Sequence, residues 1–244
     1  MDFVTLEEGY FRMNKNNNIK IIKMQDENQK QYFVPGFASI NEYNAVYAIY
    51  VENNIEWAKN CYYEAAMAIA YCKEKLNRDA FVVIKNILYP LMSDSNSIVS
   101  RFLQYNSSSD YEKAGSFSTH FGHAVQAVLK DDDQDLEHRI EWMTKRSKSG
   151  FFKKMTGVVT VFEGILDRDI PKIESGLKDI VKRLKKDQPL IIGNYMNIEA
   201  TGLAKLAWRK GLEVDIKSTF IPQALLPIKE LEHYGSYDFF KHQD

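Results

Sequence analysis

The sequence predicts an all-α protein built from stacked antiparallel helical hairpins and finished by an extended C-terminal tail. Three observations predict this fold class: a long apolar stripe in the first half, an internal repeat in the second half, and two late prolines, Pro222 and Pro227, that a helix interior does not accommodate. With 244 residues, the chain is long enough to bury roughly 70% of its unfolded surface without disulfides. We therefore predict one helical domain over residues 1–244.

The clearest helix is predicted over residues 55–76, where apolar side chains recur at spacings of three and four. This stripe consists of Ile55, Ala58, Tyr62, Ala65, Ile69, Cys72 and Leu76. A helix is predicted before it over 40–51, because tyrosines and a valine fall on one face. A second stripe over 80–88 predicts the partner of a helical hairpin, which Tyr89 and Pro90 end.

Two regions give weaker patterns. Near the N-terminus, the asparagine-rich residues 14–18 indicate a loop, whereas 19–24 and 31–35 fit either short strands or frayed helix. Further along, a short helix is expected around Ile98. The polar stretch that follows is a candidate joint between subdomains near 105–116.

The second half contains an internal repeat. Residues 123–143 align without a gap on residues 160–180, an offset of 37. The matched pairs are Val128 with Ile165, Leu129 with Leu166, Asp132 with Asp169, Leu136 with Ile173, Glu137 with Glu174, and Ile140 with Leu177. Each unit reads as a helix, a tight acidic turn whose aspartate caps, and a second helix. Neighbouring hairpins are therefore expected to stack, although the tetratricopeptide signature is absent.

The segment 197–226 joins a helix to an extended exit. Apolar side chains occupy one side of the helix and cations the other: Ile198, Leu203, Leu206 and Ala207 against Lys205, Arg209 and Lys210. Gly211 supplies a left-handed residue that ends the helix. Apolar and charged residues then alternate, which indicates an extended chain lying over the body. Trp208 is expected to anchor the helix to this tail, and Pro222 to keep the tail from becoming helical.

These residues resemble the C-terminal end of the immunity protein 49 family, bacterial proteins encoded beside polymorphic toxins. In that family a helix ending in A-x-R-x-G-L-x-V is followed by I/L-P-x-x-L-L. The matching positions here are Ala207, Arg209, Gly211, Leu212, Val214, Ile221, Pro222, Leu225 and Leu226. The resemblance extends from about Phe117 to Phe240. It implies an all-helical inhibitor that shields its host from a toxin, and it assigns neither a binding residue nor a toxin.

Composition bounds the function. The 32 basic and 33 acidic residues leave a net charge of -1, so no whole-molecule field attracts nucleic acid or anionic membrane. The two cysteines, Cys61 and Cys72, lie about 16 Å apart on one helix, too far for a disulfide, and read as core thiols. The longest apolar run, 65–72, is far below the roughly 18 residues of a membrane span. We expect a cytoplasmic protein without membrane contact.

Motifs for catalysis or cofactor binding are missing from the sequence. Phosphate-binding glycine loops, nucleophile elbows and the H-E-x-x-H zinc motif do not occur. Glu230 and His233 form a single Glu-x-x-His in the tail, whereas a di-iron bundle needs two. His120 and His123 lie three apart on a predicted helix, but a zinc site needs further ligands, and a half-buried helix wall is the simpler interpretation. We predict no catalytic residue, cofactor or metal.

Two charge clusters remain. The acidic turn comprises Asp131, Asp132, Asp133 and Asp135 with Glu137. Its simplest interpretation is a solvated, helix-capping turn, and its functional interpretation is a decoy surface for a cationic toxin cleft. The basic cluster comprises Lys145, Arg146, Lys148, Lys153 and Lys154, interleaved with Phe151 and Phe152. It is better explained as a linker between hairpins than as a nucleic-acid site.

The favoured hypothesis is a cytoplasmic immunity protein that binds and neutralises a cognate toxin encoded nearby. The alternatives are a helical-bundle enzyme, metal-dependent through His120 and His123, and a repeat-type adaptor for another protein. Bound metal would favour the enzyme, and an adjacent toxin gene the immunity protein. The sequence does not indicate the toxin's activity, its binding face or the oligomeric state.

Overall fold

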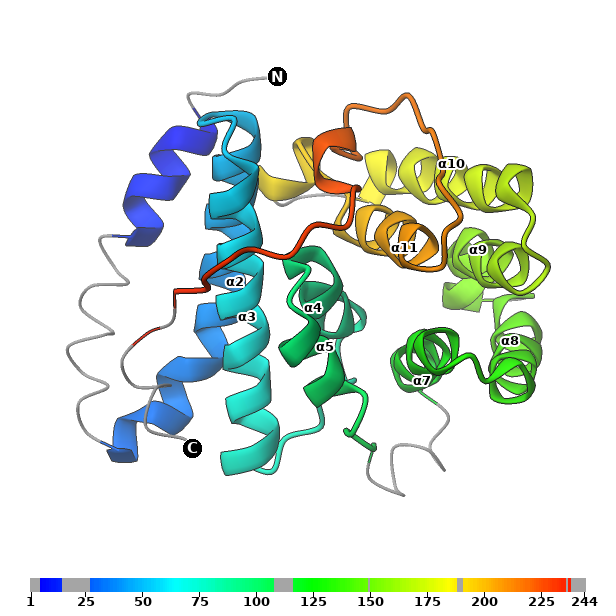
Figure 1. The fold of residues 1–244 in the computed structure, drawn as a ribbon, viewed down its shortest axis with the longest axis horizontal. Helices are drawn as coiled ribbons and strands as arrows, with labels where there is room; N and C mark the ends of the chain where they lie inside the picture. Colours follow the sequence, from blue (N-terminus) through cyan, green and yellow to red (C-terminus); the bar gives the residue numbers. More distant parts are fainter. Residues whose placement is uncertain are drawn as a thin grey trace.

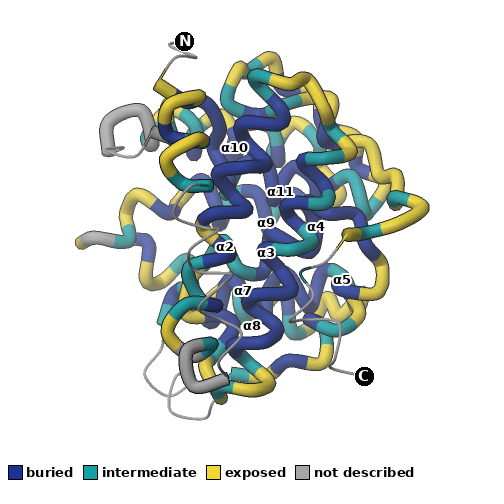
Figure 2. The backbone as a smooth tube through the Cα atoms, turned by 90° about the vertical axis from the view of Figure 1, so that its left-hand side faces the viewer, coloured by how far each residue is buried: buried dark blue, intermediate teal, exposed yellow. Residues whose placement is uncertain are grey.

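A computed structural model describes residues 5–14, 27–107, 116–148, 150–187, 191–235 and 237. Within these ranges the chain is helical and contains no strand, which confirms the all-α prediction (Figure 1). Buried backbone is concentrated in the middle of the molecule, where α3, α4, α9 and α11 lie (Figure 2).

The first half is built on one long hairpin. Its helices, after a short helix over residues 5–14, are α2 (Glu27–Tyr50), α3 (Ile55–Lys75), α4 (Leu88–Ser93) and α5 (Asn96–Phe102), with the 3-10 helix η1 (Ile84–Ile87) before α4. The turn between α2 and α3 ends at Asn54, whose side chain accepts a hydrogen bond from the Trp57 amide and so caps α3. The predicted stripe of α3 is buried from Ala58 to Cys72 against α2 and α4.

The second half consists of two further hairpins and a bridging helix. They are formed by α7 (Phe117–Lys130) with α8 (Asp133–Ser147), and by α9 (Thr156–Leu166) with α10 (Ile170–Asp187). The 3-10 helices η2 (Gly150–Met155) and η3 (Ile191–Asn194) connect these elements. Last comes α11 (Ile198–Arg209), which packs against α4 on one side and α10 on the other (Figure 1). Thus α11 joins the two halves.

The 37-residue repeat is visible in the backbone. Asp131 and Arg168, at equivalent positions, both have positive φ, 56° and 54°. Each next residue is an aspartate whose side chain accepts an amide hydrogen bond three residues later: Asp132 from Asp135, and Asp169 from Lys172. The same turn therefore closes both hairpins, as the alignment predicts.

Two predictions about local structure are wrong. Residues 80–88 do not form a helix: 80–83 are irregular, and η1 leads into α4, which continues through Pro90. Pro90 does not end the helix, because it lies in the first turn of α4, where the backbone N–H that proline lacks is not needed for a hydrogen bond within the helix. The boundary at residue 40 is also wrong, since α2 begins at Glu27 and includes 31–35 in its helical course.

Other predictions fall partly outside the described residues. Asn14 ends the first helix, and the rest of 14–18 and all of 19–24 lie outside them. The same holds for 108–115, the main part of the candidate joint. The assignment of residues 1–244 to a single domain stays a prediction.

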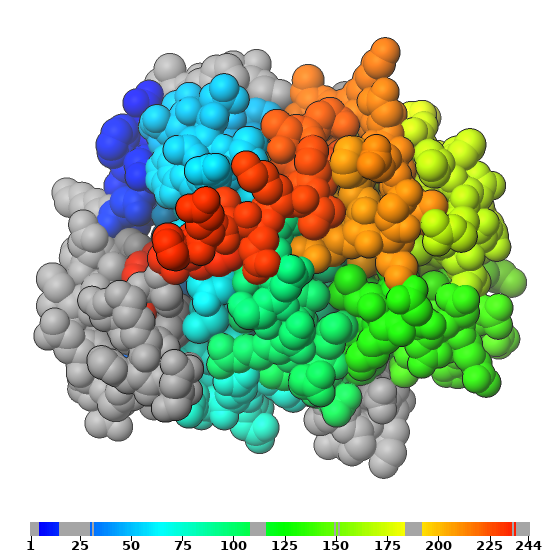
Figure 3. Space-filling view, viewed as in Figure 1, coloured from blue at the N-terminus to red at the C-terminus, as the bar shows by residue number. Residues whose placement is uncertain are grey.

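The C-terminal tail, residues 212–235, is extended and crosses the helices of both halves (Figure 3). Only the short 3-10 helix η4 (Gln223–Leu225) interrupts it. Its apolar side chains are buried: Leu212, Val214, Ile216, Ile221, Leu225 and Leu226. The prediction of an extended tail lying over the body is confirmed.

Candidate functional site

The acidic turn is an ordered, exposed group of carboxylates. Asp132 caps α8, and Asp135 pairs with Arg139 one turn later at 2.9 Å. Asp131 pairs with Lys210, which follows α11, although 77% of the Asp131 side chain remains exposed. Asp133 and Glu137 are exposed, and they have no ion-pair partner in the described part of the chain. The capping interpretation is therefore supported, and contact with a partner stays a prediction.

The corresponding turn of the second hairpin differs in charge. Lys172 reaches both Asp167, at 3.0 Å, and Glu163, at 3.2 Å. In addition, Arg168 stands at the position of Asp131, so the second turn carries less negative charge than the acidic turn. The two turns share a backbone but present different fields to solvent.

The junction of α11 with the C-terminal tail is organised around one buried carboxylate. Asp94 ends α4 in a left-handed conformation, with φ 64°, and its side chain is fully buried. Three cations contact it: Lys59 of α3 at 2.8 Å, Lys205 of α11 at 2.8 Å, and Arg209 of α11 at 3.4 Å. We call these four residues the Asp94 cluster.

Lys205, one of the cations on the side of α11 opposite its apolar stripe, is not exposed to solvent. Its side chain is fully buried, because the tail and the end of α4 cover the face of α11 that carries the cations. Arg209 is also largely buried, with a side-chain exposure of 10%. A charged face of a helix need not face water when a carboxylate from a distant segment lies opposite.

The Asp94 cluster also holds the tail. The Lys205 ammonium donates to the carbonyl oxygens of Leu225 and Pro227. Lys59 donates to the Lys229 carbonyl at 2.9 Å, and the Lys229 amide donates to Asp94 at 3.1 Å. Burial lowers the pKa of Lys205 to about 8, although Asp94 opposes the shift. One carboxylate thus faces three cations in a buried site.

Sequence reasoning missed Asp94. It follows a short helix in a run of serines and asparagine, a composition that indicates only a polar loop. The only sequence signal for a buried charge is Lys205, because it lies within one turn of apolar residues of α11 that are themselves buried. The partner, 111 residues away, has no signature in the chain.

The three residues predicted to be structural lie in α11 and the segment that follows it. Trp208 donates from its indole Nε1 to the Val214 carbonyl at 3.3 Å, which links α11 to the tail. Gly211 has φ 71°, and the Leu212 amide donates back to the Ala207 carbonyl at 3.0 Å. Pro222 immediately precedes η4. The expected anchor and left-handed stop are both present.

We expect Gly211→Val to lower the free energy of unfolding by at least about 1 kcal/mol, because a β-branched residue at positive φ is strained. A Cβ at this position would meet no atom within 4 Å, so the cost is conformational rather than steric contact with neighbours. Chemical denaturation measures it, with Gly211→Asn as the control, since asparagine tolerates this conformation. An unchanged midpoint for the valine variant would contradict the assignment.

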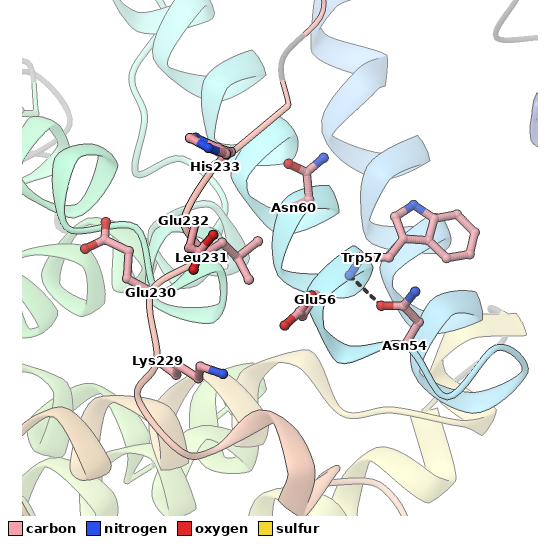
Figure 4. A pocket seen from close by; sticks show the side chains of 9 residues that line it. All are labelled: Asn54, Glu56, Trp57, Asn60, Lys229, Glu230, Leu231, Glu232 and His233. Atoms are coloured by element: carbon pink, nitrogen blue, oxygen red, sulfur yellow. Dashed lines mark hydrogen bonds between the residues drawn. The ribbon is translucent and has the colours of Figure 1, made fainter.

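A groove of about 600 Å³ lies between the start of α3 and the tail. Figure 4 shows Lys229 to His233 along one side and Asn54 to Asn60 along the other. The tail side is fixed: Glu230 accepts hydrogen bonds from the Asn96 amide and side chain at 2.8 Å, and the Gly235 amide donates to Asn60 at 2.7 Å. The Glu230 carboxylate therefore has a structural use.

The paired histidines are built into the α7–α8 hairpin. His120 stacks on Trp142, with ring centroids 3.9 Å apart, and burial lowers its pKa to about 4. His123 shares a hydrogen bond with Gln126 at 2.8 Å. No group of three potential metal ligands occurs among the residues that the structure describes. The hairpin-wall interpretation of these histidines is therefore supported.

The basic cluster lies at the C-terminal end of α8 and in η2. The Arg146 guanidinium lies 6.0 Å from the Trp142 ring and 5.7 Å from the Phe152 ring, and Phe152 stacks on Phe117. Lys145 pairs with Glu141 within α8. Lys148, Lys153 and Lys154 are exposed, while the side chain of Phe151 lies outside the described residues.

None of the described helices has the length and apolar composition that crossing a bilayer requires. A comparison with protein-family models, curated proteins and solved structures gives no match for this chain.

Proposed function

We propose that the protein is a bacterial immunity protein that binds a cognate toxin, encoded nearby, in the cytoplasm and neutralises it stoichiometrically. The observation that carries this proposal is the junction between α11 and the tail. Every quoted motif position of the family resemblance lies in this junction, and most of the apolar ones, including Leu212, Val214, Leu225 and Leu226, are buried in the core. Because the motif residues pack together, the structure supports the resemblance to the family. The proposed function is the one that this resemblance implies.

The proposed mode of action is occlusion by a preformed surface. Helix-capping hydrogen bonds and the pairs Asp131–Lys210 and Asp135–Arg139 order the acidic turn before any partner arrives. Ordered carboxylates lose little conformational entropy on binding, and they steer association with a cationic cleft. We therefore propose the acidic turn as one contact with the toxin.

The test replaces the carboxylates of the turn without removing its caps. We expect the variant Asp131→Asn, Asp132→Asn, Asp133→Asn and Asp135→Asn to fold, because asparagine caps about as well as aspartate. It should associate with the toxin about tenfold more slowly at low salt, and its rate should depend less on salt. Stopped-flow association and denaturation midpoints measure both effects.

The matched control removes four negative charges from the other hairpin: Glu163→Gln, Asp167→Asn, Asp169→Asn and Glu174→Gln. Its association rate should stay close to that of the wild type, since these carboxylates lie on the other hairpin, outside the proposed contact. Co-expression with the neighbouring toxin tests the function itself. Failure of the wild type to protect cells or to bind the toxin rejects the immunity function, whereas unchanged kinetics in the acidic-turn variant reject only that contact.

A further inference from the structure

The carboxylate of Glu230 in the tail is held by Asn96 on both of its oxygen atoms. The Asn96 backbone amide donates to Oε1 and the Asn96 side-chain amide donates to Oε2, each at 2.8 Å. Arginine holds carboxylate and phosphate groups through the same kind of paired hydrogen bonds. Both residues are exposed, so the place that this carboxylate occupies is open to solvent.

The Arg209 guanidinium, in α11, lies beside Asn96 and is poorly supplied with acceptors. Its Nη1 atom donates to the Asn96 side-chain oxygen and its Nη2 atom to Asp94, both at the long distance of 3.4 Å. Charge-assisted hydrogen bonds of this kind are usually about 2.7–2.9 Å long. The Arg209 Nε atom is buried and has no acceptor among the residues that the structure describes. The guanidinium therefore has donors left for an oxyanion.

The buried charges next to Asn96 are mostly cationic. The Asp94 cluster carries three cations and one carboxylate, and its side chains are at most 10% exposed. Burial lowers the pKa of Arg209, although Asp94, Tyr234 and Glu230 oppose the shift. The other carboxylates that line the groove beside α3 are exposed, and the Glu230 carboxylate points away from that groove (Figure 4). An oxyanion in the place of this carboxylate is therefore next to buried positive charge, which salt screens little.

The tail is anchored on both sides of Glu230 by other contacts. On one side Lys59 donates to the Lys229 carbonyl at 2.9 Å, and on the other the Tyr234 hydroxyl donates to the Ser93 carbonyl at 2.8 Å. The exposed side chain of Glu230 can therefore rotate into water while the tail stays in place. Departure of its carboxylate would vacate the place at Asn96 without unfolding the tail.

We propose that Asn96 and Arg209 form an oxyanion site that the protein's own Glu230 fills and that a phosphate group takes over when it binds. Phosphate has more acceptor oxygens than a carboxylate, so it can accept from both Asn96 amides and from the Arg209 guanidinium at once. The carboxylate of Glu230, by contrast, uses both of its oxygens on Asn96. This site is separate from the proposed toxin contact at the acidic turn, and its test does not need a toxin.

The experiment uses the full chain and inorganic phosphate as the probe, with sodium chloride of equal ionic strength as the reference. Glu230→Ala vacates the site. At about ten times its dissociation constant, phosphate should raise the thermal midpoint of this variant by about 3–6 °C. The wild type should bind phosphate at least about tenfold more weakly in calorimetry, because Glu230 fills the site most of the time. Glu232→Ala is the matched control, since it removes a neighbouring exposed carboxylate of the tail and should bind phosphate as weakly as the wild type.

Two further measurements locate the bound phosphate. In the Glu230→Ala background, Arg209→Lys keeps a positive charge beside Asp94 but loses the planar fork, so phosphate affinity should fall at least about tenfold. Circular dichroism without phosphate checks that this double variant folds. Phosphate titration of Glu230→Ala should also shift the amide resonance of Asn96 in NMR spectra, a readout that does not need the Arg209 variant.

The site is overturned if phosphate raises the midpoint of Glu230→Ala no more than sodium chloride does. Equal phosphate affinities of the wild type and Glu230→Ala also overturn it, since Glu230 would then not compete for the site. Phosphate that binds without shifting the Asn96 resonance is an adventitious ion only, held elsewhere on the protein. Tighter binding of acetate than of phosphate to Glu230→Ala overturns phosphate as the ligand.

Discussion

Replacing Asp94 by Asn is expected to destabilise the protein by about 3–5 kcal/mol, because it leaves three buried cations without their shared carboxylate. Lys205 and Asp94 are both fully buried, so water cannot replace the lost charge interaction. Domains of this kind are stable by only about 5–15 kcal/mol, so the loss is a large fraction of the total. Urea denaturation measures it. The tail should loosen as well, because Asp94 accepts the Lys229 amide, and limited proteolysis after residue 225 should become faster.

The control is an exposed ion pair. Glu141→Gln breaks the contact of Glu141 with Lys145. These two side chains are 64% and 70% exposed, so the urea midpoint should stay nearly unchanged. Lys205→Met provides a second comparison through pH. The folded-state pKa of Lys205, about 8, lies below its ordinary value of 10.5, so the unfolded chain binds more protons between these values. Wild-type stability relative to Lys205→Met should therefore rise from pH 8 to 10.5. A cost of Asp94→Asn no greater than that of Glu141→Gln would contradict the role of the cluster.

The parts of the fold that sequence predicts are those set by local patterns. The stripe of α3 follows from spacing alone, and both repeat turns follow from an aspartate placed to cap the next helix. The prediction over 80–88 is wrong because an apolar spacing of three and four over only nine residues does not require a helix. Val82 and Val83, which resist helix through their branched side chains, lie there in an irregular segment.

Residues of the candidate site are predictable only where they act locally. Gly211, Trp208 and the capping Asp132 interact with residues close to them in sequence, so local patterns predict their placement. The partners in the Asp94 cluster are far apart in sequence, as Lys59, Asp94 and Lys205 come from three different helices or their ends. Long-range pairing of charges has no periodic signal, so the burial of Lys205 against Asp94 does not follow from the sequence.

The two repeat hairpins also differ in a way that the alignment does not reveal. Gly157 of α9 and Gly176 of α10 lie at a close backbone crossing, where a Cβ on Gly176 would come within 2.7 Å of the Gly157 carbonyl oxygen. The equivalent residues of the first hairpin, 37 positions earlier, are His120 and Arg139. There the His120 ring lies against Trp142. The same fold is therefore packed with side chains in one hairpin and backbone to backbone in the other.

Gly176→Val is accordingly expected to destabilise the protein by about 3 kcal/mol or more, because its Cβ would collide with the backbone of both Gly157 and Val161. Replacing a glycine in a helix interior gains less than about 1 kcal/mol of helix propensity, so the steric collision decides the sign of the stability change. Thermal and urea denaturation provide the measurement. Ser175→Val is the control, since it places the same side chain on the adjacent, exposed position of α10 and should change stability by less than about 0.5 kcal/mol. Equal midpoints for the two variants would mean that α9 and α10 separate without cost. The close crossing would then contribute nothing to the rigidity of the second hairpin.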